Sequence, residues 1–162
     1  EGLLVRAPEG AGRREIEAFI AKNEQWIANT MKKLQSAEPP AGQLSKAELE
    51  ELAKTAMRVI PERVRYYAPK VGVTYGRITI RNQRTKWGSC SSKGNLNFNC
   101  LLMLAPPEVL DSVVVHELCH RKEMNHSERF YAEVLRVFPE YHKWNGWLKK
   151  HSAELMARNP KS

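Results

Sequence analysis

Two histidines four residues apart, followed by a third six residues later, constrain this chain more than any other feature of its sequence. They are His116, His120 and His126. On an α-helix, residues four apart differ by about 40° around the axis and about 6 Å along it, so His116 and His120 face the same side. Two imidazoles on one face suit Zn²⁺, which binds nitrogen at roughly 2.0–2.1 Å. The pattern therefore predicts a metal site on a helix.

The glutamate that follows the first histidine points in a different direction. Glu117 would be rotated by about 100° from His116, so its carboxylate would lie beside the metal instead of on it. From there it could take a proton from water that the metal activates. We therefore expect Glu117 to act as a general base.

A catalytic zinc also needs a third protein ligand and one open coordination position. On an unbroken helix His126 would lie about 9 Å beyond His120 and would point elsewhere. The chain must therefore turn within residues 121–125 if His126 is to join the first two histidines. We expect that turn, with a new helix beginning near Ser127.

Three glutamates compete with His126 for the third ligand position, namely Glu123, Glu128 and Glu133. Glu123 could approach the metal only if the helix continued past the second histidine. Glu133 would lie on the next helix, where some zinc peptidases carry a ligand glutamate followed four residues later by aspartate. Val137 occupies that later position here. We favour His126.

A solvated helix with two surface histidines would carry the same motif. However, Val113, Val114 and Val115 precede the motif and form an apolar run, which predicts a buried helix. Burying two histidines and a glutamate is costly unless they are paired or bind a metal. We therefore prefer a metal site.

The composition narrows the class of protein. The 162 residues can bury one real core, and no run of about 18 apolar residues predicts a membrane span. The three cysteines, Cys90, Cys100 and Cys119, are an odd number and form no Cys-x-x-Cys pair. This argues against a disulfide framework and for a reducing compartment, so we expect a cytoplasmic protein without membrane contact.

The net charge is +8, with 26 basic and 18 acidic residues. Such a balance permits weak attraction to nucleic acid. The charges are spread along the chain, so we favour a well-solvated basic surface over a dedicated nucleic-acid site.

The pattern along the chain predicts two units. Residues 1–36 are expected to form a strand and an amphipathic helix, and the chain begins with Glu1, so we expect a partner strand upstream. Residues 44–162 are expected to form the main domain, after a linker that is rich in Pro, Ala and Gly.

The main domain opens with a helix whose capping box is Ser45 and Glu48, with Pro61 as a kink or restart and Pro69 as its end. A strand pair or one bent strand is expected over residues 73–81, followed by a hairpin. Further helices are expected over about 106–122, 127–138 and 141–158.

The strand over residues 96–101 alternates in polarity, with Asn97 and Asn99 on one face. In zinc peptidases a sheet edge beside the metal commonly binds extended substrate by strand addition. Asn97, Asn99 and Tyr131 are therefore candidate substrate-binding residues. Candidates to stabilise an oxyanion are Tyr131, Tyr141 and His142, which the sequence does not rank.

Several motifs resemble the YgjP-like predicted metal-dependent hydrolases, and the resemblance spans almost the whole chain. The matching stretches are Val5-Arg6-Ala7-Pro8, Trp87-Gly88-Ser89-Cys90-Ser91, Asn97-Phe98-Asn99, Ala105-Pro106-Pro107-Glu108, His116-Glu117-Leu118-Cys119-His120, Asn125-His126-Ser127 and Pro139-Glu140-Tyr141.

That family is similar in its core to the SprT and WLM zinc peptidases. The resemblance implies an α+β fold: a zincin-like metallopeptidase core with a small antiparallel sheet on the metal helix, plus the N-terminal strand-helix unit. It also implies that His116, His120 and His126 bind Zn²⁺ and that Glu117 is the general base. Metzincins share the histidine spacing but need glycine where this chain has Glu123, so we do not place the chain among them.

Three hypotheses follow. The first is a zinc-dependent peptidase that acts on protein or peptide substrates. The second is a DNA-associated protease like the SprT group. The third is a non-catalytic zinc-bound binding module, in which a fourth protein ligand would close the metal site. Cys119 is the nearest sulfur in the sequence, but on the helix it should point into the core.

Overall fold

The computed structural model describes residues 42–160, so the strand-helix unit predicted for residues 1–36 lies outside the described residues. The elements in chain order are α3 (Lys46–Val71), β1 (Ile78–Arg81), β2 (Gly88–Cys90), β3 (Leu96–Asn99), the 3-10 helix η1 (Cys100–Leu104), α4 (Pro107–Cys119), α5 (Glu128–Val137) and α6 (Tyr141–Met156). This mixture confirms the α+β class. Among the described helices, none combines the length and the apolar character needed to cross a membrane.

Helix α3 begins as predicted and ends later. The Ser45 hydroxyl accepts from the Glu48 amide at 3.0 Å, and the Glu48 carboxylate accepts from the Ser45 amide at 2.8 Å. Pro61 and Pro69 both lie inside the helix. The prediction of an end at Pro69 was wrong: the helix continues to Val71. Gly72 then ends it with a left-handed φ of 87°, a conformation that glycine adopts without steric cost.

The small sheet has the order β1-β3-β2, and it is mixed where an antiparallel sheet was predicted. β2 and β3 pair antiparallel across a short turn in which Gly94 has a φ of 88°. β1 pairs with β3 in parallel. The chain reverses direction twice between β1 and β3, so these two strands run in the same direction. β2 lies at the edge of the sheet and does not separate them.

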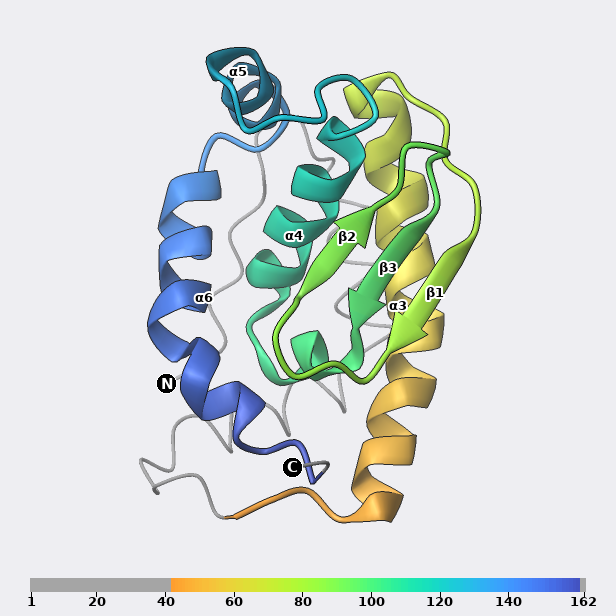
Figure 1. The fold of residues 1–162 in the computed structure, drawn as a ribbon, viewed down its shortest axis with the longest axis vertical. Coiled ribbons are helices and arrows are strands. Elements are labelled where there is room, and N and C mark those ends of the chain that lie inside the picture. Colours follow the sequence, from red (N-terminus) through yellow and green to blue (C-terminus); the bar gives the residue numbers. More distant parts are fainter. Residues whose placement is uncertain (1–41, 161–162) are drawn as a thin grey trace.

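The helices lie behind the sheet and beyond its β2 edge (Figure 1). β2 lies beside α4, and α3 passes behind the sheet and packs along α4. α6 flanks α4 on the side away from the sheet, and α5 crosses near the C-terminal end of α4. α4 is therefore the central helix of this part of the chain.

α4 has the burial that its apolar sequence predicts. It starts at Pro107, with Glu108 in the first turn, and every one of its residues except His116 is buried. Cys119, expected in the core, is fully buried. The helix ends at Cys119 with His120 as its C-cap, about one turn earlier than the predicted end near residue 122.

A buried ion pair fixes α4 against α3. The Arg63 guanidinium donates to both carboxylate oxygens of Asp111 at 2.9 and 3.1 Å, and the Tyr67 hydroxyl donates to the same carboxylate at 3.2 Å. Arg63 and Asp111 are only 5% and 6% exposed. Asp111 precedes His116 by five residues on α4, so this contact holds the metal helix against the long helix behind it.

We predict that Arg63→Met destabilises the protein by roughly 3–5 kcal/mol, because it leaves the Asp111 carboxylate buried without its cation. Urea denaturation measures the loss. The double variant Arg63→Met/Asp111→Leu should recover most of it, since no charge then remains buried. A single variant that unfolds at the same urea concentration as the wild type would contradict this role.

Candidate metal centre

Three imidazoles converge at the C-terminal end of α4. The Nε2 atoms of His116 and His120 are 3.3 Å apart, those of His120 and His126 are 3.1 Å apart, and those of His126 and His116 are 3.2 Å apart. His116 and His120 come from α4 and its cap, and His126 comes from the turn before α5. The structure thus brings together the three histidines that the sequence spacing singled out.

These separations fit one tetrahedral ion. Two nitrogen ligands at 2.0–2.1 Å from a tetrahedral centre lie roughly 3.3–3.4 Å apart. The Nδ1 atom of His120 lies 3.0 Å from the carbonyl oxygen of Glu123, which can only accept, so Nδ1 carries a proton. In the neutral ring, Nε2 of His120 therefore presents a lone pair to the shared centre, as a metal ligand must.

Burial keeps the first two imidazoles neutral. It lowers the pKa of His116 to about 3, with a further lowering from the neighbouring His120 and His126. Burial also lowers the pKa of His120. Neutral imidazole is the form that binds metal, so neither ring has to lose a proton near neutral pH.

A tyrosine orients His116. The Tyr141 hydroxyl lies 2.8 Å from Nδ1 of His116 and comes from the first residue of α6. Tyr141 is 3% exposed, and burial raises the pKa of its phenol, with a further rise from Tyr131. Tyr141 was one of three unranked oxyanion candidates in the sequence. Its contact suits a residue that fixes the ring and tautomer of His116.

Phe130 supports all three histidines, and sequence reasoning did not identify this role. Its ring centroid lies 4.9, 4.5 and 5.0 Å from those of His116, His120 and His126. Phe130 is fully buried in the first turns of α5, and its amide donates to the capping Ser127 hydroxyl at 3.3 Å. The sequence signal for this contact was the predicted helix start at Ser127, because it places residue 130 in the first turn of the helix, facing back toward the turn before it.

Glu117 lies against the edge of the sheet. It is 6% exposed, and burial raises the pKa of its carboxyl to about 8, an effect that the positive charge of Lys86 opposes. A Cβ atom on Gly88 would lie 3.0 Å from a Glu117 carboxylate oxygen and 3.2 Å from Val113. Gly88 therefore allows β2 to approach α4 closely at the position of Glu117.

The rival ligands lie elsewhere. Among the residues that the structure describes, no fourth His, Cys, Asp or Glu joins the histidine cluster. Glu123 contributes only its carbonyl oxygen, to His120. Glu128 is exposed in the first turn of α5. The Glu133 carboxylate accepts from Lys122 at 2.8 Å and from Arg136 at 2.8 and 3.1 Å.

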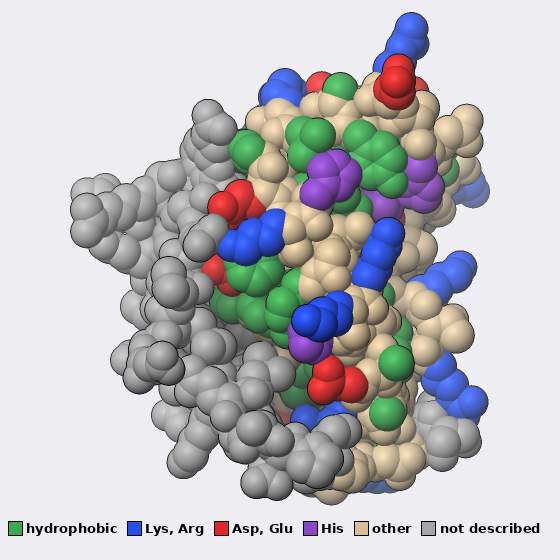
Figure 2. Space-filling view, turned by 90° about the vertical axis from the view of Figure 1, so that its left-hand side faces the viewer, with side chains coloured by type: hydrophobic (Ala, Val, Ile, Leu, Met, Phe, Trp, Pro, Cys, Tyr) green, Lys and Arg blue, Asp and Glu red, His purple; other side chains and the backbone are tan. Residues whose placement is uncertain are grey.

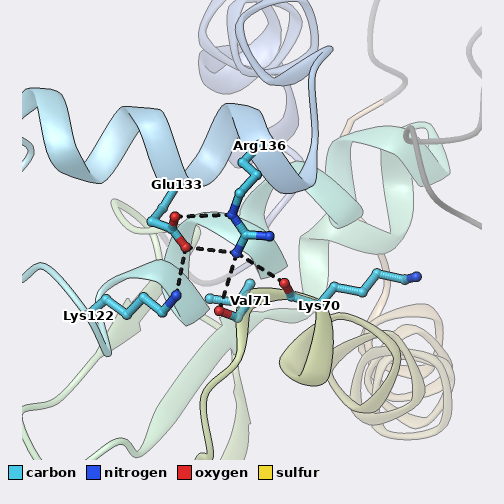
Figure 3. Close-up of polar contacts among 5 residues, drawn as sticks. All are labelled: Lys70, Val71, Lys122, Glu133 and Arg136. Atoms are coloured by element: carbon cyan, nitrogen blue, oxygen red, sulfur yellow. Dashed lines mark hydrogen bonds and ion pairs between the residues drawn. The ribbon is translucent and has the colours of Figure 1, made fainter.

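Glu133 joins three elements and is not part of the histidine cluster (Figure 3). Lys122 belongs to the turn after α4, and Arg136 to α5. Arg136 also donates to the carbonyl oxygens of Lys70 and Val71, at 3.1 and 3.4 Å, at the C-terminal end of α3. The turn that delivers His126 is thereby tied to both neighbouring helices.

Of the proposed substrate-binding residues, Asn99 does not face the cleft. It is 1% exposed, its amide donates to the carbonyl oxygens of Gln83 and Lys86, and its oxygen accepts from Leu101. The placement contradicts direct contact with a substrate, because these internal bonds occupy the amide. The alternation of the strand suggested an outward face, but η1 and the loop before β2 cover it.

The other proposed contact residues are less enclosed. Asn97 donates to Ser89 at 3.2 Å and accepts from Arg81 at 3.0 Å. Tyr131 is half-buried, with its ring 6.3 Å from that of His126. His142 is exposed, and its ring lies 5.8 Å from that of Tyr131.

Two adjoining hollows flank the histidines and share Trp87, Gly88, His116 and Glu117. The narrow hollow, of about 150 Å³, extends toward α6 and is walled by Val113, Tyr141 and Leu148. The open hollow, of about 350 Å³, includes Lys86, Cys90, His120, Met124 and His126. Figure 2 shows histidines gathered on one face, with hydrophobic side chains beside them and basic side chains nearby.

Comparison with known proteins indicates the family of the chain. A family model described as YgjP-like, metallopeptidase domain, matches residues 40–151, more than half of the chain. A 60-residue stretch, 37% of the chain, is 33% identical to the UTP pyrophosphatase of Escherichia coli (strain K12). The match spans only 36% of that relative's length.

Two solved structures are similar in fold. They are the metallopeptidase zymogens jannalysin of Methanocaldococcus jannaschii and abylysin of Pyrococcus abyssi. Each has a TM-score of 0.51, and each match covers 57% of this chain. The matches cover 96% of jannalysin and 95% of abylysin. The identities are 22% and 23%, so the likeness concerns the fold.

We predict that Tyr141→Phe weakens zinc binding about 10-fold, because His116 loses the partner that orients its ring. Competition with a chromogenic chelator measures the affinity. Tyr131→Phe is the matched control, since its hydroxyl makes no hydrogen bond to the described residues, and it should bind zinc like the wild type. Equal affinities for the two variants would contradict the orienting role.

We predict that Glu133→Gln lowers the free energy of unfolding by about 1 kcal/mol at pH 7. The hydrogen bonds from Arg136 and Lys122 lower the pKa of Glu133 to about 2, from an ordinary value of 4.5. Ionised Glu133 therefore stabilises the protein above about pH 4.5, and this contribution is lost as the pH falls toward 2.

Urea denaturation at pH 7, 5 and 3 tests this pH dependence. The difference between Glu133→Gln and the wild type should shrink at the lowest pH. Glu50→Gln, on the exposed face of α3, is the control and should change stability little at any of the three. A constant difference across the series would contradict the ionic contribution.

Proposed function

The chain belongs to the YgjP-like metallopeptidase family, and from this membership we propose that it is a zinc-dependent peptidase with Glu117 as its general base. The observation that carries the proposal is the convergence of three Nε2 atoms at 3.1–3.3 Å, with the Glu117 carboxylate beside them in the same cleft. His116, His120 and His126 are the proposed ligands.

Imidazole ligands in a tetrahedral set favour zinc among the common divalent ions. When bound, the ion would supply a Lewis acid that polarises the scissile carbonyl and makes water more acidic. The cluster contains no fourth protein ligand among the described residues, which supports an open position and argues against a closed structural site.

Glu117 would move the proton. Peptide hydrolysis adds water across the C–N bond: the carbonyl carbon gains the hydroxyl group, and the leaving nitrogen gains the proton. The carboxylate would accept that proton from the attacking water and return it to the nitrogen. Burial alone favours the protonated acid, but a divalent cation beside Glu117 favours the carboxylate form that the reaction needs.

The free edge of β2 suits an extended peptide. Asn99 donates to Trp87 and Ser91 donates to Asn95 across the hairpin, so bonded pairs alternate along it. The backbone groups of Gly88 and Cys90 therefore point away from β3, and both residues line the cleft. A substrate strand could add to this edge beside the metal centre, while the narrow hollow could take an apolar side chain.

A second candidate is hydrolysis of a nucleoside triphosphate, the substrate class printed in the name of the Escherichia coli relative. The observation that favours it is Lys86 at the mouth of the metal cleft, where a cation suits phosphate oxygens. A DNA-associated protease of the SprT kind remains a weaker proposal. It rests on the net charge of +8, and salt-dependent DNA binding would support it.

We predict that Glu117→Gln lowers turnover at least 100-fold while the protein still binds one zinc, because the general base is lost and the ligands remain. Zinc-loaded protein is assayed against casein and, separately, against UTP. Glu128→Gln, a rival ligand on the exposed start of α5, should keep both zinc and activity.

These assays can also overturn the proposal. If the zinc-loaded wild type cleaves neither substrate faster than a chelated sample, the hydrolase function fails. Cleavage of UTP alone would select the second candidate. Loss of zinc in Glu128→Gln would overturn the proposed ligand set.

A further inference from the structure

The cleft contains a lysine in addition to the three histidines and Glu117. Among the described residues that line the two hollows, Lys86 is the only Lys or Arg. Its side chain is exposed at the open hollow, which it shares with Glu117 and the three histidines. A single positive charge at a metal cleft raises the question of which negative group it meets.

The backbone at Lys86 is held from two sides. The buried amide of Asn99 donates to the carbonyl oxygens of Gln83 and Lys86, at 2.8 and 3.0 Å. On the next residue, the Trp87 indole donates to the Ser152 hydroxyl of α6 at 2.9 Å. Asn99 of β3 and Ser152 of α6 thus fix the position from which the lysine extends.

The ammonium group has no carboxylate partner among the described residues. No ion pair within 4.0 Å joins Lys86 to Glu117, although both line the open hollow. Lys86 therefore shares the open hollow with Glu117 and the three histidines, and no described carboxylate competes there for its ammonium group.

We propose that Lys86 is a catalytic residue that donates to the anionic oxygen of the substrate's reacting group at the metal centre. The inference rests on the proposed hydrolase function and adds the residue that meets the negative charge. A peptide carbonyl is neutral when it binds and becomes anionic during attack, whereas a phosphate anhydride is anionic from the start. The same ammonium group would serve either oxygen, with different kinetic consequences.

The experiment compares Lys86→Met, Lys86→Arg and the control Lys93→Met, which removes an exposed lysine from the turn between β2 and β3. With a neutral peptide, Lys86→Met should lower kcat about 10- to 100-fold and change KM little, because only the transition state loses a contact. With UTP, Lys86→Met should raise KM as well, because the bound substrate also loses its contact with the lysine. Lys86→Arg should recover part of either effect, and Lys93→Met should match the wild type.

Binding of inorganic phosphate to the zinc-loaded protein, measured by calorimetry, supplies a readout that needs no turnover. Lys86→Met should weaken phosphate binding about 10-fold relative to Lys93→Met, with zinc content and thermal unfolding unchanged. The proposal is overturned if the Met variants at 86 and 93 agree in both turnover and phosphate binding. If the wild type is active and the two Met variants agree, the hydrolase function still stands. If the wild type is inactive but Lys86→Met still binds phosphate more weakly, only the anion site is supported.

Discussion

His126 lies six residues beyond His120, too far along a continuous helix for the three imidazoles to meet. The chain meets this constraint by ending α4 at Cys119 and placing His120 at its cap. The carbonyl oxygen of Glu123 then turns back to accept from His120. One short turn thus positions both the second and the third histidine, so the site depends on how that turn is held.

Polar contacts, both buried and near the surface, fix the elements around the site. Asp111 ties the metal helix to Arg63 of α3, and Glu133 joins the ligand turn to α5 and α3 through Lys122 and Arg136 (Figure 3). Asn99 organises the loop that leads into β2. Asp111 and Asn99 are buried and have several partners each, which is the condition under which buried polar atoms stabilise a unique arrangement. The apolar core supplies burial, while these contacts set the relative positions of the elements around the cleft.

The electrostatics of the cleft follow from its burial. Low exposure keeps His116 and His120 neutral and favours the protonated form of Glu117. A metal ion at the three imidazoles would favour the Glu117 carboxylate and would take up the lone pairs of the imidazoles. Metal binding would therefore shift Glu117 toward the ionised form that the proposed general base needs.

The sequence by itself determined the local features. Helical spacing placed His116 and His120 on one face, the valines before them predicted a buried helix, and Ser45 and Ser127 marked helix starts that the structure confirms. These follow from contacts within a few residues. The sequence motifs also indicated the family.

Only the tertiary structure decided which distant residues meet. In the structure, Tyr141 contacts His116, Phe130 packs against all three imidazoles, and Gly88 lies against Glu117. The sheet also proved to be mixed. It also enclosed Asn99, whose strand pattern had suggested an outward face. Alternation along a strand identifies two faces, but it does not say what covers each one. That depends on the packing of elements far apart in the chain, which no local pattern encodes.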